Sequence, residues 1–168
     1  EDVYASAIEA GCWAVDVDAR LPKELIGRIL GHARWKGVRV IISRHYPTTP
    51  PLDLLVLHTE EAFEMGADVA KIVTTARSTR EATVPLGLYG KFAPERVVAF
   101  AMGDAGRFSR RLSLLMGAPY TYVCTNEEEA TASGQPTREW LERSFEAPYD
   151  LEDCTLPDAV KIPCSKSE

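Results

Sequence analysis

The sequence has no apolar stretch long enough to cross a bilayer, no closely spaced cysteine pair and no excess of positive charge. A membrane span needs about 20 consecutive apolar residues, and no signal-peptide pattern is present either, so we expect no membrane partner. The four cysteines are far apart and lack metal-ligand spacing, which is typical of reduced thiols in a cytoplasmic protein without a metal site. A net charge of -6 argues against nucleic acid as a partner.

What the sequence does contain is a regular alternation of short apolar runs and amphipathic stretches. Its 168 residues fit one domain with a single core, and we expect 1–168 to form that domain with 146–168 as a tail. Alternation of strands and helices favours a parallel α/β sheet. The predicted strands are 12–18, 38–43, 68–74, 96–103 and 120–125.

Polar side chains stand at the carboxyl ends of several predicted strands. In parallel α/β folds these ends gather at one edge of the sheet, and active sites lie there. The sequence therefore predicts a site at this edge. The side chains expected around it are those of Asp16, Asp18, His45, Met102, Arg110 and Gln135.

The apolar run "VIISRHYPTTPP", residues 40–51, ends by presenting a histidine beside a loop rich in proline and threonine. One interpretation of His45 is a surface residue at the end of a strand. The other is a general acid or base delivered to a site. The run alone favours the surface residue, so the rest of the chain has to decide.

Lys71 lies inside a predicted strand, on the side shared by Val69 and Val73. Desolvation there favours the neutral amine, which attacks carbonyl groups and forms a Schiff base. The alternative is a lysine whose charged end reaches water from an edge strand. The roles of two further groups of residues also have two interpretations each. Arg110 is either a carboxylate-binding or a surface arginine, and Asp16 with Asp18 are either site residues or structural strand ends.

Five short motifs in one order resemble the type I 3-dehydroquinate dehydratases of the shikimate pathway, which supply aromatic amino acid biosynthesis. Each motif alone is weak, but together they run from about Cys12 to about Phe145. The family's lysine falls on Lys71 and its histidine on His45. The matching segments are Asp16-Val17-Asp18, Ser43-Arg44-His45 with Thr49-Pro50, Gly66 to Ile72, Met102 to Arg110, and Thr131 to Gln135.

The resemblance implies a TIM-barrel-like (β/α)8 fold, but only five strands are predicted here. The family's first strands carry an arginine and acidic residues that have no counterpart near Glu1. We therefore expect a barrel that is incomplete or has a rearranged strand order. Residues 159–168 resemble the family's first strand, so we expect 160–164 to pair beside 12–18. A second subunit, hence a homodimer, is the other way to cover that edge.

The resemblance also implies a lyase reaction on 3-dehydroquinate with no metal or organic cofactor. Lys71 would form the imine, and His45 would remove a proton and then protonate the departing hydroxide. Arg110 would bind the substrate carboxylate, and Gln135 would bind its hydroxyl groups from a mobile loop. In that loop Thr131 replaces a serine and Ser133 a proline. The remaining expected substrate contacts are Met102, Asp16 and Asp18.

Two other functions fit some of the same residues. Another lysine-imine barrel, such as a class I aldolase, explains Lys71 but not Arg110 together with Gln135. A non-catalytic binding or regulatory domain fits the missing strands, but such a domain has no need for both His45 and Lys71.

Overall fold

In the computed structural model, which describes residues 2–146, four parallel strands form one sheet in the order β1-β2-β3-β4. Strands alternate with helices along the chain, which confirms the predicted α/β class. The elements are α1 (Asp2–Glu9), β1 (Ala14–Asp18), α2 (Lys23–Lys36), β2 (Arg39–His45), α3 (Leu52–Met65), β3 (Val69–Thr75), α4 (Thr79–Thr83), β4 (Val97–Met102), α5 (Arg107–Leu115) and α6 (Arg138–Glu146), with short 3-10 turns at 85–90, 94–96, 104–106 and 127–129.

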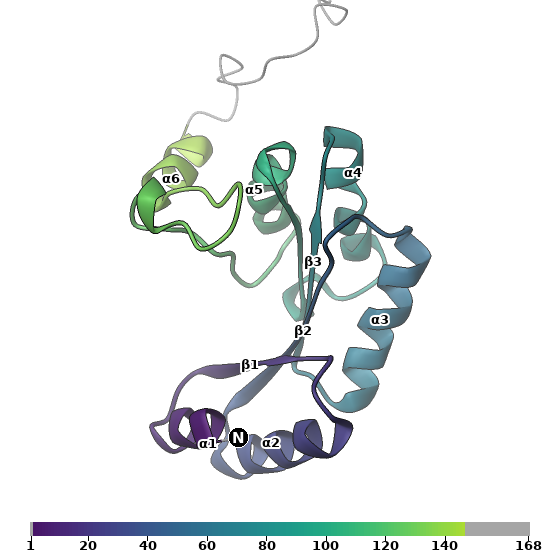
Figure 1. Ribbon diagram of the computed structural model, residues 1–168, viewed down its shortest axis with the longest axis vertical. Coiled ribbons are helices and arrows are strands. Elements are labelled where there is room, and N and C mark those ends of the chain that lie inside the picture. Colours follow the sequence, from purple (N-terminus) through teal and green to yellow (C-terminus); the bar gives the residue numbers. More distant parts are fainter. Residues whose placement is uncertain (1, 147–168) are drawn as a thin grey trace, which may run out of the picture.

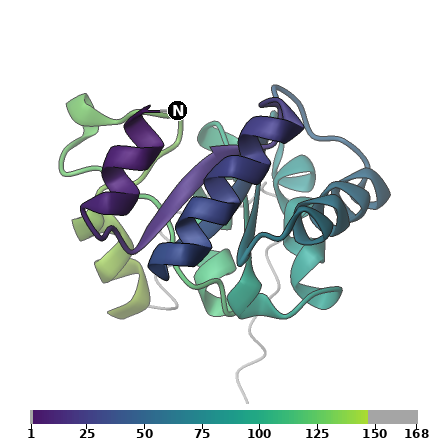
Figure 2. The same ribbon diagram turned by 90° about the horizontal axis from the view of Figure 1, so that it is seen from below.

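The helices α1, α2 and α3 cover one side of the sheet, here called the outer face. Figure 1 shows α3 along β2 and β3, and Figure 2 shows α1 and α2 side by side beneath β1. The outer core contains the apolar side of α2, namely Ile26, Ile29, Leu30 and Ala33. Their spacing of three and four residues places them on one stripe of the helix, which is why α2 lies against the sheet.

Residue types that favour helix ends stand where three of the helices begin or end. Gly37 follows α2 with φ of 71°, and Gly66 follows α3 with φ of 104°, a conformation that other residues rarely adopt. Thr137 begins α6, where its hydroxyl oxygen accepts the Trp140 amide at 3.1 Å. These caps fix where each helix returns the chain to the sheet.

The opposite side of the sheet, here called the inner face, carries every second residue of each strand. Register pairs Asp16 with Ile41, and Ser43 with Lys71. An apolar cluster fills much of this face, formed by Ile41, Val69, Val73, Val98 and Phe100 with Met102, Tyr120 and Tyr122 against it.

The predicted fifth strand at 120–125 is wrong: within 2–146 only Cys124 in that segment makes a bridge, with Thr137. Tyr120 and Tyr122 bury their rings on the inner face instead of continuing the sheet beside β4. Covering the apolar inner face removes its side chains from water, which is favourable. The predicted strand at 160–164 lies outside the described residues.

Candidate active site

Lys71 is buried in the middle of the inner face, where only 7% of the residue is exposed. Its Nζ donates to Oδ2 of Asp16 at 2.6 Å and to the Tyr122 hydroxyl at 3.3 Å. Asp16 therefore neutralises the ammonium charge, which burial alone would make costly. The predicted inward direction of Lys71 is confirmed.

Ser43 explains how this ion pair forms between strands that are not neighbours. Asp16 is on β1 and Lys71 on β3, with β2 between them. Ser43 pairs with Lys71 in the register and is itself buried, so a small side chain lies beneath the path of the lysine. A long side chain at position 43 would fill that path.

His45 is the last residue of β2 and lies on the same face, one pleat beyond Ser43. His45 is exposed at the end of the strand, but the nearby protein still removes some water from its imidazole and lowers its pKa below the ordinary 6.5, and the nearby Lys71 charge lowers it further. Asp16 and Asp18 act in the opposite direction. The direction of this pKa shift favours the neutral imidazole, the form a general base requires.

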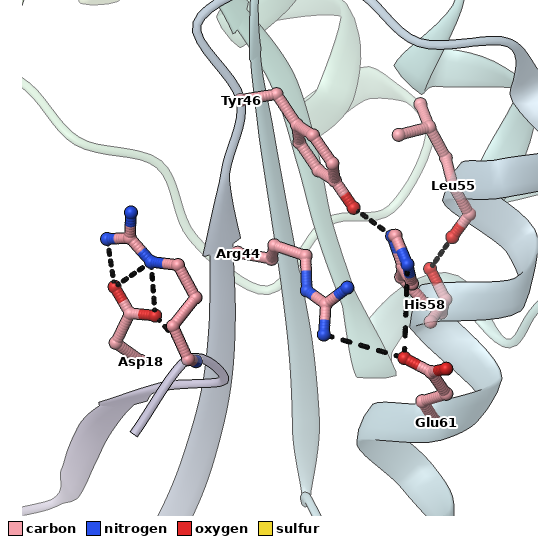
Figure 3. A network of polar contacts seen from close by, with 8 residues as sticks. Asp18, Arg44, Tyr46, Leu55, His58 and Glu61 are labelled. Carbon is pink, nitrogen blue, oxygen red and sulfur yellow. Dashed lines mark hydrogen bonds and ion pairs between the residues drawn. The ribbon is translucent and has the colours of Figure 1, made fainter. Parts of the chain in front are cut away.

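The end of β2 is fixed from the outer face by a polar network (Figure 3). Arg44 pairs with Glu61 at 3.5 Å, and the Tyr46 hydroxyl hydrogen bonds to Nδ1 of His58, so β2 is joined to α3 on both sides of His45. The Tyr46 amide also donates to the Val73 carbonyl. Because alternate strand residues face opposite ways, anchoring 44 and 46 outward directs His45 inward.

Arg110 lies on α5 and is almost fully buried, with 1% of the residue exposed. Its guanidinium stacks 4.2 Å from the Phe100 ring, and Nη1 donates to the Tyr122 carbonyl at 3.4 Å. Burial lowers the pKa of Arg110 to about 10, and no carboxylate among residues 2–146 offsets this. Its Nε also has no hydrogen-bond partner there. A buried cation without an anion is a site for one.

The loop 131–135 docks against the carboxyl end of β4, next to Met102. The Gly103 amide donates to the Ser133 carbonyl at 3.0 Å, so the loop is tied to the strand by its backbone. Oε1 of Gln135 accepts from the Thr131 amide and hydroxyl, at 2.8 and 3.1 Å. The structure thus brings the loop to the predicted edge of the sheet. The side-chain amide oxygen of Gln135, however, points back to Thr131 within the loop.

Asp18 forms an ion pair with Arg20, which the sequence did not indicate. Arg20 donates to both of its carboxylate oxygens, with the closest contact at 2.6 Å. This hydrogen bonding holds the pKa of the Asp18 carboxyl below its ordinary value. Tyr122 is the other site residue that sequence reasoning missed, because "YTYV" has the alternation of a strand.

No group of three or more metal-ligating side chains gathers in residues 2–146. Over the same residues, no helix is long and apolar enough to cross a membrane.

Comparison with known proteins gives a consistent result. Residues 1–151 match the family model for type I 3-dehydroquinase. The chain is 39% identical over 141 residues to a 3-dehydroquinate dehydratase of Thermococcus gammatolerans, covering 83% of this chain and 63% of that one. It is 42% identical over 151 residues to that of Thermococcus onnurineus, covering 88% and 66%.

Solved structures support the same fold. A type I 3-dehydroquinate dehydratase from Clostridium difficile, carrying covalently modified comenic acid, superposes with a TM-score of 0.77 at 23% identity, covering 88% of this chain and 59% of that one. The enzyme from Geobacillus kaustophilus gives 0.72 at 24%, covering 89% and 62%. The chain spans somewhat under two thirds of these proteins. With the family model matched over 1–151, the chain belongs to the type I 3-dehydroquinase family.

Proposed function

We propose that this chain dehydrates 3-dehydroquinate to 3-dehydroshikimate through an imine on Lys71. The observation that carries the proposal is the placement of Lys71 and His45 on one face of adjacent strands, together with a buried Arg110 that lacks an anion. The reaction needs a nucleophilic amine, a proton acceptor and a carboxylate-binding cation. The relatives that match this sequence are named for this reaction.

The steps balance with these residues alone. Lys71 passes a proton to Asp16, and its amine attacks the ketone carbon. The carbonyl oxygen then takes one proton from the amine and the other back from Asp16, and it leaves as water to give a protonated imine. Neutral His45 removes the proton from the adjacent carbon, and the electron pair moves to the imine nitrogen as an enamine. The enamine expels the hydroxyl group, which takes the proton from His45 and leaves as a second water. Hydrolysis of the imine then releases product and Lys71.

Substrate binding falls to the groups around this centre. A carboxylate on Arg110 would supply the anion that the buried guanidinium lacks, and bidentate geometry would orient the ring. Met102 would contact the apolar side of the ring, and Asp18 and the loop residues Thr131, Ser133 and Gln135 would bind hydroxyl groups. Gln135 has to turn away from Thr131 to do so.

The proposal extends to the whole molecule. A four-stranded sheet leaves the edge of β1 without a neighbour among residues 2–146, and barrel closure would come from 160–164 or from a second copy of the chain. We further propose a single domain and a cytoplasmic location.

A turnover assay tests this function. Dehydration places a carbon–carbon double bond beside the ketone, and the conjugated product absorbs ultraviolet light that the substrate does not. We expect product from the wild-type chain and none from Lys71→Ala, with Lys91→Ala as a matched control on an exposed lysine. Absence of product from a folded wild-type chain that binds 3-dehydroquinate would overturn the proposal and favour a binding domain, which the incomplete sheet also fits.

A further inference from the structure

Tyr122 lies in the segment after α5 that crosses the inner face, between the two cations of the site. Its ring packs with Tyr120, centroid to centroid at 5.7 Å, and both belong to the inner apolar cluster. The segment follows Ala118, which is itself buried in the outer core. Tyr122 is therefore held by apolar packing as well as by the polar contacts described next.

On one side Tyr122 holds the lysine. The Tyr122 hydroxyl accepts from Lys71 Nζ and donates to Oδ2 of Asp16, both at 3.3 Å. The ring also lies under the ammonium, with Nζ 4.3 Å from its centroid. Three contacts thus stabilise Lys71 in its charged, ion-paired form: the carboxylate, the hydroxyl and the ring.

On the other side Tyr122 holds the arginine. Its backbone carbonyl accepts from Nη1 of Arg110 at 3.4 Å, and the buried guanidinium has no carboxylate partner among residues 2–146. Tyr122 therefore contacts both cations of the site. In this arrangement Lys71 and Arg110 are both buried from solvent.

We propose that Tyr122 is a positioning residue that holds Lys71 on Asp16 and Arg110 in the apolar cluster until a ligand takes over these contacts. A carbonyl carbon reaches Lys71 Nζ only after the hydroxyl and ring of Tyr122 withdraw. This deepens the proposed function, and it rests on that function only for the identity of the ligand. The contacts themselves are independent of it.

Reductive methylation with formaldehyde and cyanoborohydride tests, without any substrate, whether Tyr122 restrains Lys71. The lysine amine attacks formaldehyde, water leaves, and hydride from cyanoborohydride reduces the imine to a methylamine. Peptide mass spectrometry gives the methylation rate of each lysine in the folded chain. The exposed Lys23 and Lys91 serve as internal standards.

Two variants and one matched control separate the contributions. Tyr122→Phe keeps the ring and removes the hydroxyl with its hydrogen bonds to Lys71 and Asp16. We therefore expect Lys71 methylation to rise about threefold relative to Lys23, the effect of losing the bond to Nζ. The rate should also reach half its maximum at a lower pH, because the charged pair is less stabilised. The other titratable groups on this face are unchanged in this variant, namely Asp16, Asp18, His45, Arg110 and Tyr120. Tyr122→Ala removes both contacts and should give a rise of about tenfold.

Tyr120→Phe is the control, because it removes the hydroxyl of the neighbouring ring, which makes no hydrogen bond to Lys71 or Asp16 among residues 2–146. It should leave both the Lys71 rate and its pH profile within about twofold of wild type. Should Tyr122→Ala unfold, every lysine would react like Lys23, and Tyr122→Phe alone decides. A Tyr122→Phe chain with wild-type Lys71 rate and pH profile overturns the proposal. If the wild-type chain shows no turnover while Tyr122→Phe still raises Lys71 methylation, the proposed function is wrong and the positioning role of Tyr122 stands.

Discussion

Two polar networks flank the carboxyl half of β2, one on each face of the sheet, and they are built from the same kinds of side chain. The outer network joins Arg44, Tyr46, His58 and Glu61 (Figure 3). The inner network joins Lys71, Asp16 and Tyr122, with His45 beside it. Each has a cation, a carboxylate, a tyrosine and a histidine.

The networks differ in how they are assembled and in what their cations do. His58 and Glu61 are three residues apart on one helix, next to the strand that carries Arg44, so neighbouring elements suffice. The inner contact between Tyr122 and Asp16 spans 106 positions of sequence. An arginine stays charged, whereas a buried lysine can give up its proton and react. We infer that the outer network supports the strand and the inner one performs chemistry.

Changing His45 should give the largest effect on function. His45→Ala removes the proposed base while Lys71 keeps its contacts, so the rate of product formation should fall by about a hundredfold or more. The imine should still form and accumulate, which borohydride reduction and intact-mass measurement detect. Turnover within about tenfold of wild type, a difference of ~1.4 kcal/mol, would show that another group is the main base.

Asp16→Asn should have the largest effect on stability. It leaves the Lys71 ammonium buried without a counter-charge and should cost about 2 kcal/mol, less than a fully buried pair because Asp16 is partly exposed. Urea denaturation measures the loss. Asp18→Asn is the matched control on the same strand and face; its partner Arg20 is in solvent, so a smaller loss is expected. Equal losses would contradict a special role for the inner pair.

A smaller loss of stability, and no change in Lys71 reactivity, should follow from Tyr46→Phe. The substitution removes the hydroxyl that binds His58 and should cost about 1 kcal/mol in urea denaturation. Formaldehyde methylation of Lys71 should stay at the wild-type rate, since the outer network does not touch it. A change in that rate comparable to the one expected for Tyr122→Phe would break the distinction between the two faces.

The smallest effect is a dependence of stability on pH that both networks share. Burial lowers the pKa of His45 and of His58 below the ordinary 6.5. On acidification the unfolded chain therefore binds protons first, so stability is complete above about pH 6.5 and falls as pH drops through the folded-state values. Urea denaturation at pH values across this window measures the slope, and His58→Gln should reduce it. A stability that rises on acidification there would contradict these pKa directions.

The sequence predicted the elements whose signals are local. The first four predicted strands are all confirmed, because each is a short apolar run that the local sequence marks clearly. Lys71 was predicted on the inner face because a period of two residues is a property of the strand itself. These are the features that the chain determines within about ten residues of each position.

The misses come from contacts between distant segments. "YTYV" alternates like a strand, yet whether 120–125 pairs beside β4 or covers the inner face depends on how much of that face other elements cover. Tyr122 was missed for the same reason, since its partners Asp16 and Lys71 belong to other strands.

Reductive trapping tests the central claim, that the inner network carries the chemistry, most directly. The folded chain is incubated with 3-dehydroquinate and borohydride, and peptide mass spectrometry locates the reduced adduct. We predict ligand mass on the peptide that contains Lys71, and none on that peptide in Lys71→Ala. An adduct confined to other lysines such as Lys23 or Lys91, or no adduct while turnover is measurable, would contradict the account.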